Sequence, residues 1–267
     1  MQITVGDICL HCELLGSGEP LLLVHGFPLR GELWHAVASR LRDWRCIIPD
    51  LRGHGRSSVT PAVSIAQFAD DLAMLLDALG EHRPVVFCGL SLGGVIAFEF
   101  FRRYRSRLRA LVLVDCRADA ESVAGREQRA ALAQRVLVEG SSVAAAAMVG
   151  RLFSPVAPPE LKARWQGYMC ATAPEGIAAT ARALADRPDS TATLRHIDLP
   201  TLLVFGADDE ITPPAVGRQM QASIAGARLE VIAGAGHLPP VERPEEFAAV
   251  LASFLECLPP CPVLGGS

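Results

Sequence analysis

The sequence predicts an α/β fold, a doubly wound, mostly parallel sheet with a helical cap inserted between two strands. Short apolar runs alternate with amphipathic helical segments, which is typical of parallel strands joined by helices. The later runs are continuously hydrophobic, as expected for strands that are covered on both faces. Strands are expected over Ile8–Leu14, Leu21–His25, Arg45–Pro49, Pro84–Gly89, Ala110–Asp115, Thr201–Gly206 and Leu229–Ala233.

Helices are expected between these strands, where apolar residues recur at helical spacing. Pro213, Pro214 and Pro244 fall in first helical turns, where proline is tolerated because its missing N–H would have no partner there. The expected helices span Glu32–Arg42, Val63–Leu79, Leu92–Tyr104, Pro213–Ile224 and Pro244–Leu255.

One region interrupts this alternation, because no strand candidate occurs from about residue 117 to about residue 190. Helical stretches such as Arg126–Glu139 and Ser142–Leu152 fill it, so we expect a helical cap over one edge of the sheet. The expected organisation is a core of residues 1–116 and 191–258, a cap of residues 117–190, and an irregular tail of residues 259–267.

The composition argues against several classes of function. A net charge of −4 over 267 residues gives no electrostatic reason to expect a nucleic acid or an anionic membrane as partner. The N-terminus lacks a signal-peptide pattern and no run approaches the roughly 18 apolar residues of a spanning helix, so a soluble, cytoplasmic protein is expected. The eight cysteines lack the spacing of a zinc site, and neither a metal nor a cofactor is expected.

A serine between two hydrophobic segments is the strongest chemical signal. Ser91 lies in Gly-Leu-Ser-Leu-Gly at residues 89–93, between the apolar runs VVFC and GVIAFEF. A strand that turns through this pattern directly into a helix is a nucleophile elbow, in which the serine takes a strained backbone conformation. A serine that merely caps the helix would not need small residues on both sides. We therefore interpret Ser91 as a nucleophile.

A serine hydroxyl needs a base, and the base needs an acid that orients it. Among the seven histidines, His237 follows the last expected strand in a glycine-rich loop, which places it at the same sheet edge as Ser91. Structural or solvated roles are expected for the others.

Two adjacent aspartates are candidates for the acid. Asp208 and Asp209 follow the expected strand Thr201–Gly206, and physical reasoning alone does not choose between them. Asp50 and Asp115 also end strands and are weaker competitors.

A serine that attacks a carbonyl group also needs donors for the developing oxyanion. The expected donors are the backbone N–H groups of Phe27, in HGFP after an early strand, and of Leu92, directly after the serine. His25 is expected to hydrogen-bond within its loop, and a cis bond before Pro28 is compatible with the turn. The stretch DLRGHGRSS at residues 50–58 lacks P-loop spacing and is expected to be a rigid turn.

With these motifs the chain resembles α/β-hydrolases over nearly its whole length, because HGFP, DLRGHGRSS, GLSLGG, GADDEITPP and GAGHLPPVERPEEF occur in the family's order. The resemblance implies the α/β-hydrolase fold, with Ser91 as nucleophile, His237 as base, and Phe27 and Leu92 as oxyanion-hole residues. In relatives the acid stands three residues after the glycine that ends its strand, which selects Asp209.

Within the family, the chain is most similar to serine esterases and 3-oxoadipate enol-lactonases. The implied function is cofactor-free hydrolysis of small to medium carboxylic esters through an acyl-enzyme, by a monomer or homodimer. The partner is a small-molecule ester or lactone. The alternatives are an enol-lactonase or other lactonase, a C–C hydrolase or perhydrolase with the same triad, and a non-catalytic ligand-binding relative. Candidate pocket residues are Trp34, Met148, Phe153, Trp165 and Tyr168.

Overall fold

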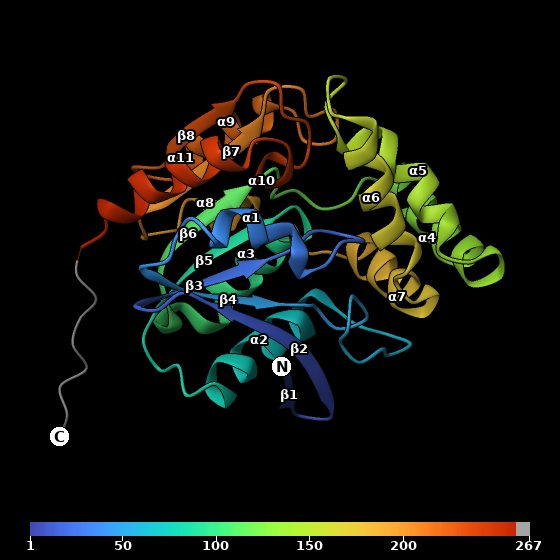
Figure 1. The fold of residues 1–267 in the computed structure, drawn as a ribbon, viewed down its shortest axis with the longest axis horizontal. Helices are drawn as coiled ribbons and strands as arrows, with labels where there is room; N and C mark the ends of the chain where they lie inside the picture. Colours follow the sequence, from blue (N-terminus) through green and yellow to red (C-terminus); the bar gives the residue numbers. More distant parts are fainter. Residues whose placement is uncertain (260–267) are drawn as a thin grey trace.

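The structure is a computed structural model that describes residues 1–259, and it confirms the expected class of fold. In the described chain, eight strands form one sheet in the order β1-β2-β4-β3-β5-β6-β7-β8 (Figure 1). From β3 and β4 onward neighbouring strands are parallel, whereas β2 is antiparallel to both β1 and β4. The strands are β1 Gln2–Val5, β2 Ile8–Leu15, β3 Glu19–Val24, β4 Trp44–Pro49, β5 Val85–Leu90, β6 Leu108–Val114, β7 Thr201–Gly206 and β8 Arg228–Ile232.

Every expected strand is present, and β1 is an additional strand that was not expected. Only Val5 of its four residues is fully buried, so the segment carries little of the apolar signal that marks the other strands. Gly6 has a φ of 57° and makes the tight turn into β2. The short β1 is therefore the edge strand at the antiparallel end of the sheet.

The helices between strands agree with expectation, with one exception. The predicted helix Glu32–Arg42 is wrong over most of its length: the chain forms a 3-10 helix, η1 Gly31–Trp34, and a single turn, α1 His35–Ala38. The Ser39 hydroxyl donates to the Ala36 carbonyl, a local bond that competes with continuation of the helix. The other core helices are α2 Ile65–Ala78, α3 Leu92–Tyr104, η2 Arg105–Arg107, α9 Pro214–Ser223, α10 Pro239–Glu242 and α11 Pro244–Glu256.

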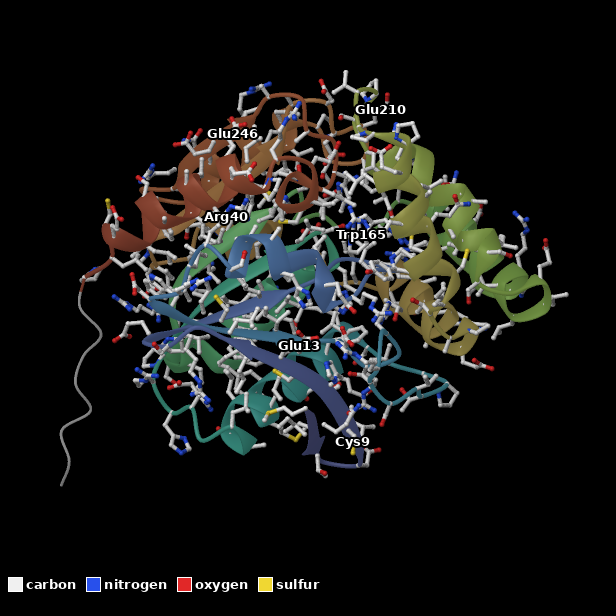
Figure 2. All side chains as sticks on the ribbon, in the orientation of Figure 1. Cys9, Glu13, Arg40, Trp165, Glu210 and Glu246 are labelled. Carbon is white, nitrogen blue, oxygen red and sulfur yellow. The ribbon has the colours of Figure 1, made fainter. Side chains whose placement is uncertain are left out.

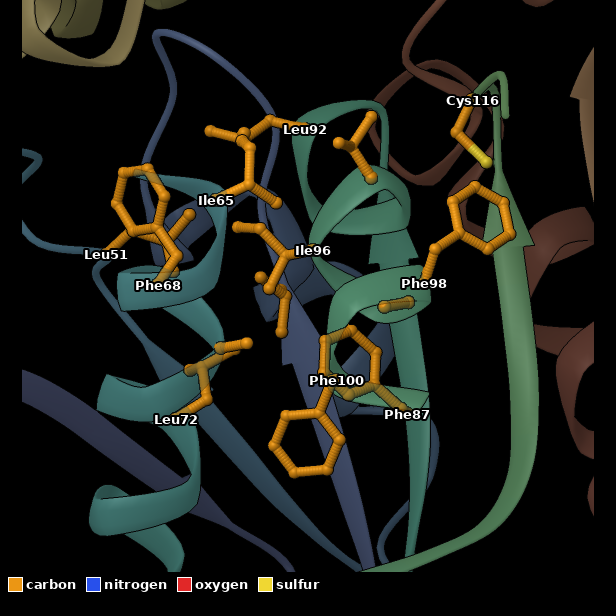
Figure 3. Packing of buried hydrophobic residues seen from close by; sticks show 14 of the residues in the cluster. Leu51, Ile65, Phe68, Leu72, Phe87, Leu92, Ile96, Phe98, Phe100 and Cys116 are labelled. Atoms are coloured by element: carbon orange, nitrogen blue, oxygen red, sulfur yellow. The ribbon is translucent and has the colours of Figure 1, made fainter. Parts of the chain in front are cut away.

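Both faces of the sheet are covered, which explains the continuous apolar runs. In β5, Phe87 belongs to the core between the sheet and α2 and α3, while its neighbours Val86 and Cys88 belong to the core on the opposite face. Figure 3 shows the first of these cores, where Phe68 of α2 and Ile96 of α3 pack over the strands. Every residue of β5 is therefore buried.

Five helices connect β6 to β7, where the sequence predicts a cap. Helices α4–α7 gather on one side of the sheet in Figure 1, and Trp165 of α6 lies toward the core in Figure 2. The boundaries at residues 117 and 190 stay a prediction, and residues 260–267 of the expected tail lie outside the described residues. The helices are α4 Val123–Glu139, α5 Ser142–Leu152, α6 Pro159–Cys170, α7 Pro174–Ala185 and α8 Thr191–Leu194.

The helices within residues 1–259 are either too short or too polar to be membrane spans. None of them combines the length and the apolar character that crossing a bilayer requires.

The turn between β5 and α3 predicts a contrast between two helical glycines. A Cβ on Gly93 would lie 2.4 Å from the backbone oxygen of Val24, whereas a Cβ on Gly150 in α5 would meet nothing within 4 Å. Gly93→Ala should cost about 2 kcal/mol and lower the Tm by about 4 °C or more. Gly150→Ala should leave the Tm unchanged or raise it, because alanine favours a helix by about 1 kcal/mol. Calorimetry of both variants tests this, and equal Tm values would contradict it.

Candidate active site

Five residues that follow parallel strands meet at one edge of the sheet. Phe27 follows β3, Ser91 follows β5, Asp115 follows β6, Asp209 follows β7 and His237 follows β8. These five strands are consecutive neighbours in the sheet. Because the carboxyl ends of parallel strands point the same way, ligand sites of α/β proteins collect there.

Ser91 occupies a strained turn between β5 and α3. Its φ is 54° and its ψ is −107°, in the left-handed range that non-glycine residues rarely adopt. A Cβ on Gly89 would lie 2.3 Å from the carbonyl oxygen of Gly93, so the turn closes only on a glycine. The half-buried Ser91 side chain does not cap α3, which removes the alternative in which it serves only the helix.

Asp209 and His237 form a buried pair. The Nδ1 atom of His237 lies 2.7 Å from Oδ2 of Asp209, and the two residues are 2% and 3% exposed. The backbone N–H groups of Ile211 and Thr212 donate to Oδ1 at 2.7 Å and 3.1 Å, and the Thr212 hydroxyl donates to Oδ2 at 2.7 Å. Burial alone would raise the pKa of Asp209, but the hydrogen bond and charge of His237 and the Thr212 hydroxyl outweigh it, and the pKa is lowered.

The competing aspartates lie in different surroundings. Asp208 is exposed, and its side chain makes no hydrogen bond within residues 1–259. Asp50 accepts from the backbone N–H groups of Gly31 and Arg56, so it braces the turn after β4. Asp115 lies beside Asp209: one side-chain atom from each of Asp115, Asp209 and His237 lies within 4.8 Å of the others.

The cap and α10 hold the loop that carries His237. The backbone N–H of His237 donates to the carbonyl of Leu152, at the end of α5, at 2.9 Å. The Glu242 carboxylate accepts from the N–H groups of Gly236 and Ser154, each at 2.8 Å. The contacts of Glu242 and Thr212 at this site were not expected from the sequence. A hydroxyl three residues after Asp209 could have drawn attention to Thr212, whereas no local pattern marks Glu242.

The two expected oxyanion donors are available. Within residues 1–259, neither the N–H of Phe27 nor that of Leu92 donates to a protein acceptor. A Cβ on Gly26 would lie 3.2 Å from the Cβ of Ser91, so the loop before Phe27 lies directly against the serine. The bond between Phe27 and Pro28 is cis.

His25 has a structural role. The ring is fully buried, its Nδ1 donates to the Gly26 carbonyl at 2.9 Å, and its Nε2 accepts from the N–H of Leu51 at 2.9 Å. Burial lowers the pKa of His25 to about 4, so the ring is neutral and joins two loops. This confirms the expected bond within the loop and adds a second one outside it.

The candidate pocket residues separate into three places. Met148 lines a cavity of about 480 Å³ between the cap and the core, together with Phe27 and Ile211. Trp165 and Tyr168 line a smaller cavity of about 220 Å³ between α6 and η1. The other two, Trp34 and Phe153, belong to the hydrophobic core.

One contact of the expected triad is not formed in this structure. The Ser91 hydroxyl makes no hydrogen bond to any side chain of the described chain, His237 included. Such bonds are often loose in a site without substrate, so the geometry is compatible with a base and a nucleophile at one edge.

Comparison with known proteins identifies the family of the chain. The family model described as alpha/beta hydrolase fold matches residues 19–244. The chain is 31% identical over 256 residues to a pimeloyl-[acyl-carrier protein] methyl ester esterase of Neisseria meningitidis, covering 89% of this chain and 93% of the relative. Its structure is similar to a thermophilic esterase from Thermogutta terrifontis, with a TM-score of 0.93, 40% identity and coverage of 96% and 97%.

A further solved structure is an enol-lactonase from Burkholderia xenovorans, with a TM-score of 0.88, 27% identity and coverage of 96% of this chain and 100% of that one. The relatives thus include both esterases and an enol-lactonase, the two activities that the sequence resemblance implies. The family match spans most of the chain, including the edge where the five residues meet. The chain therefore belongs to the alpha/beta hydrolase fold family and is related to its esterases.

Proposed function

We propose that the protein is a serine-dependent carboxylic ester hydrolase. The observation that supports this most directly is the buried Asp209–His237 hydrogen bond at the sheet edge that also presents the strained Ser91. In the proposed reaction, Ser91 attacks the ester carbonyl while His237 accepts its proton, and the Phe27 and Leu92 amides stabilise the oxyanion. His237 then protonates the departing alcohol, and water releases the acid from the acyl-enzyme by the same route.

The lowered pKa of Asp209 suits this role. The carboxylate remains ionised at neutral pH, so it can keep the proton of His237 on Nδ1 and leave Nε2 free to act as base. A cytoplasmic location, and a monomer or homodimer, stay predictions.

A specific observation favours esters or lactones that carry a negative charge. Four arginines and one glutamate line the 480 Å³ cavity, although the whole chain has a net charge of −4. Arg117, Arg129 and Arg135 pair with Asp119, Glu121 and Glu139. Arg151 has no ion pair within residues 1–259, so it can bind an anionic group of a substrate.

The nucleophile can be tested directly. A fluorophosphonate probe should label Ser91, and Ser91→Ala should lose both the label and at least about 10⁴-fold of the rate of p-nitrophenyl butyrate hydrolysis. Mass spectrometry of the labelled peptide and a steady-state assay check this. Labelling at another residue, or full activity of the variant, would refute the assignment.

The two adjacent aspartates provide a matched pair. Asp209→Asn should reduce kcat by about 10³-fold or more, because the amide cannot hold the His237 ring in the required tautomer. Asp208→Asn makes the same chemical change at an exposed neighbour and should stay within about threefold of the parent enzyme. If Asp208→Asn were the more damaging substitution, the acid would have to be reassigned.

The charge preference can be tested with esters of equal length. We expect a higher kcat/KM for p-nitrophenyl hemiglutarate than for p-nitrophenyl valerate, which replaces the carboxylate by a methyl group. Arg151→Gln should reduce kcat/KM for hemiglutarate about fivefold more than for valerate, equivalent to about 1 kcal/mol for one partly exposed charge pair.

Arg218→Gln provides the control, because Arg218 is an exposed arginine on α9 outside this cavity. It should leave the ratio of the two substrates unchanged. Equal losses for both esters in Arg151→Gln would argue against anion binding at this residue.

A further inference from the structure

A second carboxyl group lies behind the proposed triad, and the proposed reaction does not use it. Asp115 follows β6, is fully buried, and has a φ of 41°. Its backbone N–H donates to Val204 of β7 at 3.0 Å, which fixes it beside the strand that leads to Asp209. A non-glycine residue with positive φ and an ionisable side chain in the core is costly, so a function must be sought for it.

The hydrogen bonds of the two carboxyl groups are unequal. Asp209 accepts from four protein donors, two of them backbone N–H groups and two of them the side chains of Thr212 and His237. Asp115 accepts from one, the N–H of Gly206, on Oδ1 at 2.9 Å. Its Oδ2 atom is buried, and no donor in the described chain reaches it. The carboxyl of Asp209 lies close by, with one oxygen of each carboxyl group within 4.8 Å of the other.

Two buried carboxyl groups at this separation strongly disfavour ionisation of both, and one proton between them removes the repulsion. The four donors stabilise negative charge on Asp209, so the proton belongs on Asp115. Burial and then the charge of Asp209 raise the pKa of Asp115 well above its usual value, which agrees with this distribution. The proton also gives the otherwise unpaired Oδ2 a hydrogen bond to make.

We propose that Asp115 is a positioning residue, a neutral carboxylic acid whose hydroxyl donates a hydrogen bond to Asp209 and holds that carboxylate against His237. The inference rests on the proposed function, in which Asp209 orients the base. Asp115 touches neither substrate nor reacting atoms. It acts by adding a fifth donor to Asp209.

The other charged groups near Asp115 leave this distribution intact. They are Asp209 and His237, together with Glu242 of α10. The Glu242 carboxylate is already bound by two backbone N–H groups. Its charge also disfavours ionisation of Asp115, so it supports the neutral form.

Two substitutions separate the ionised from the neutral form, and both tolerate the positive φ of residue 115. Asp115→Asn retains an acceptor for Gly206 and a donor for Asp209, whereas Asp115→Gly removes both. With p-nitrophenyl butyrate, Asp115→Gly should lower kcat about tenfold at unchanged KM. Asp115→Asn should restore most of that loss.

The acidic limb of the pH profile of kcat/KM distinguishes an ionised from a neutral Asp115. If Asp115 were ionised, Asp115→Asn would remove a negative charge near His237, weaken its imidazolium form, and shift the limb to lower pH by about one unit or more. We expect the limb of Asp115→Asn within about 0.3 units of the parent. A shift of a full unit, or an Asp115→Gly variant with the parent's kcat, would overturn the proposal.

An infrared measurement tests the proton without relying on activity. At neutral pH the parent should show the C=O band of a protonated carboxylic acid, and Asp115→Asn should lose it, while Asp208→Asn keeps it. Absence of the band in the parent would overturn the proposal even if Asp115→Gly failed to fold. Loss of activity in Ser91→Ala tests the proposed function separately, so the two failures are distinguishable.

Discussion

The turn between β5 and α3 is the constraint on which the rest of the site depends. Its backbone passes within contact distance of the Val24 carbonyl and of the loop that carries Phe27, so three segments can meet only where side chains are absent. The strain at Ser91 is compatible with a stable protein because both neighbouring elements are buried over nearly their whole length. The packing of β5 in the core thus also holds the turn that carries Ser91 rigid, as a nucleophile requires.

Much of the fold could be predicted because its signals are local. The boundaries of β7, α3 and α5 agree with expectation, since each is a sustained apolar pattern that begins directly after Pro200, Ser91 or Ser141. The prediction of a helix over Glu32–Arg42 was wrong because the apolar residues of this segment satisfy helical spacing. In the folded chain, burial of these residues against the core and the hydrogen bond of the Ser39 side chain shorten the helix. Tertiary contacts of this kind leave no mark in a short window.

The residues of the candidate site also differ in whether a local sequence pattern marks them. Ser91 and His237 lie in glycine-rich loops with recognisable spacing, and the structure places both at the predicted sheet edge. The difference between Asp208 and Asp209 depends on which side chain turns inward: Asp209 is buried beside His237, whereas Asp208 is exposed, and this supports the proposal of Asp209 as the acid. Asp115 and Glu242 contact residues far apart in sequence, Gly206 and Ser154, so only the folded chain reveals these contacts, whereas the bond from Thr212 to Asp209 is local.

The bond from the His237 amide to the Leu152 carbonyl has a consequence for how this protein could change over evolutionary time. The cap is where substrate preference would be expected to diverge, because its helices line the cavity beside Phe27. Yet the last carbonyl of α5 also anchors the loop of the proposed base. Cap segments exchanged between relatives would therefore have to keep the backbone of residue 152 in its place, which restricts the length and direction of α5 rather than the side chains that it carries.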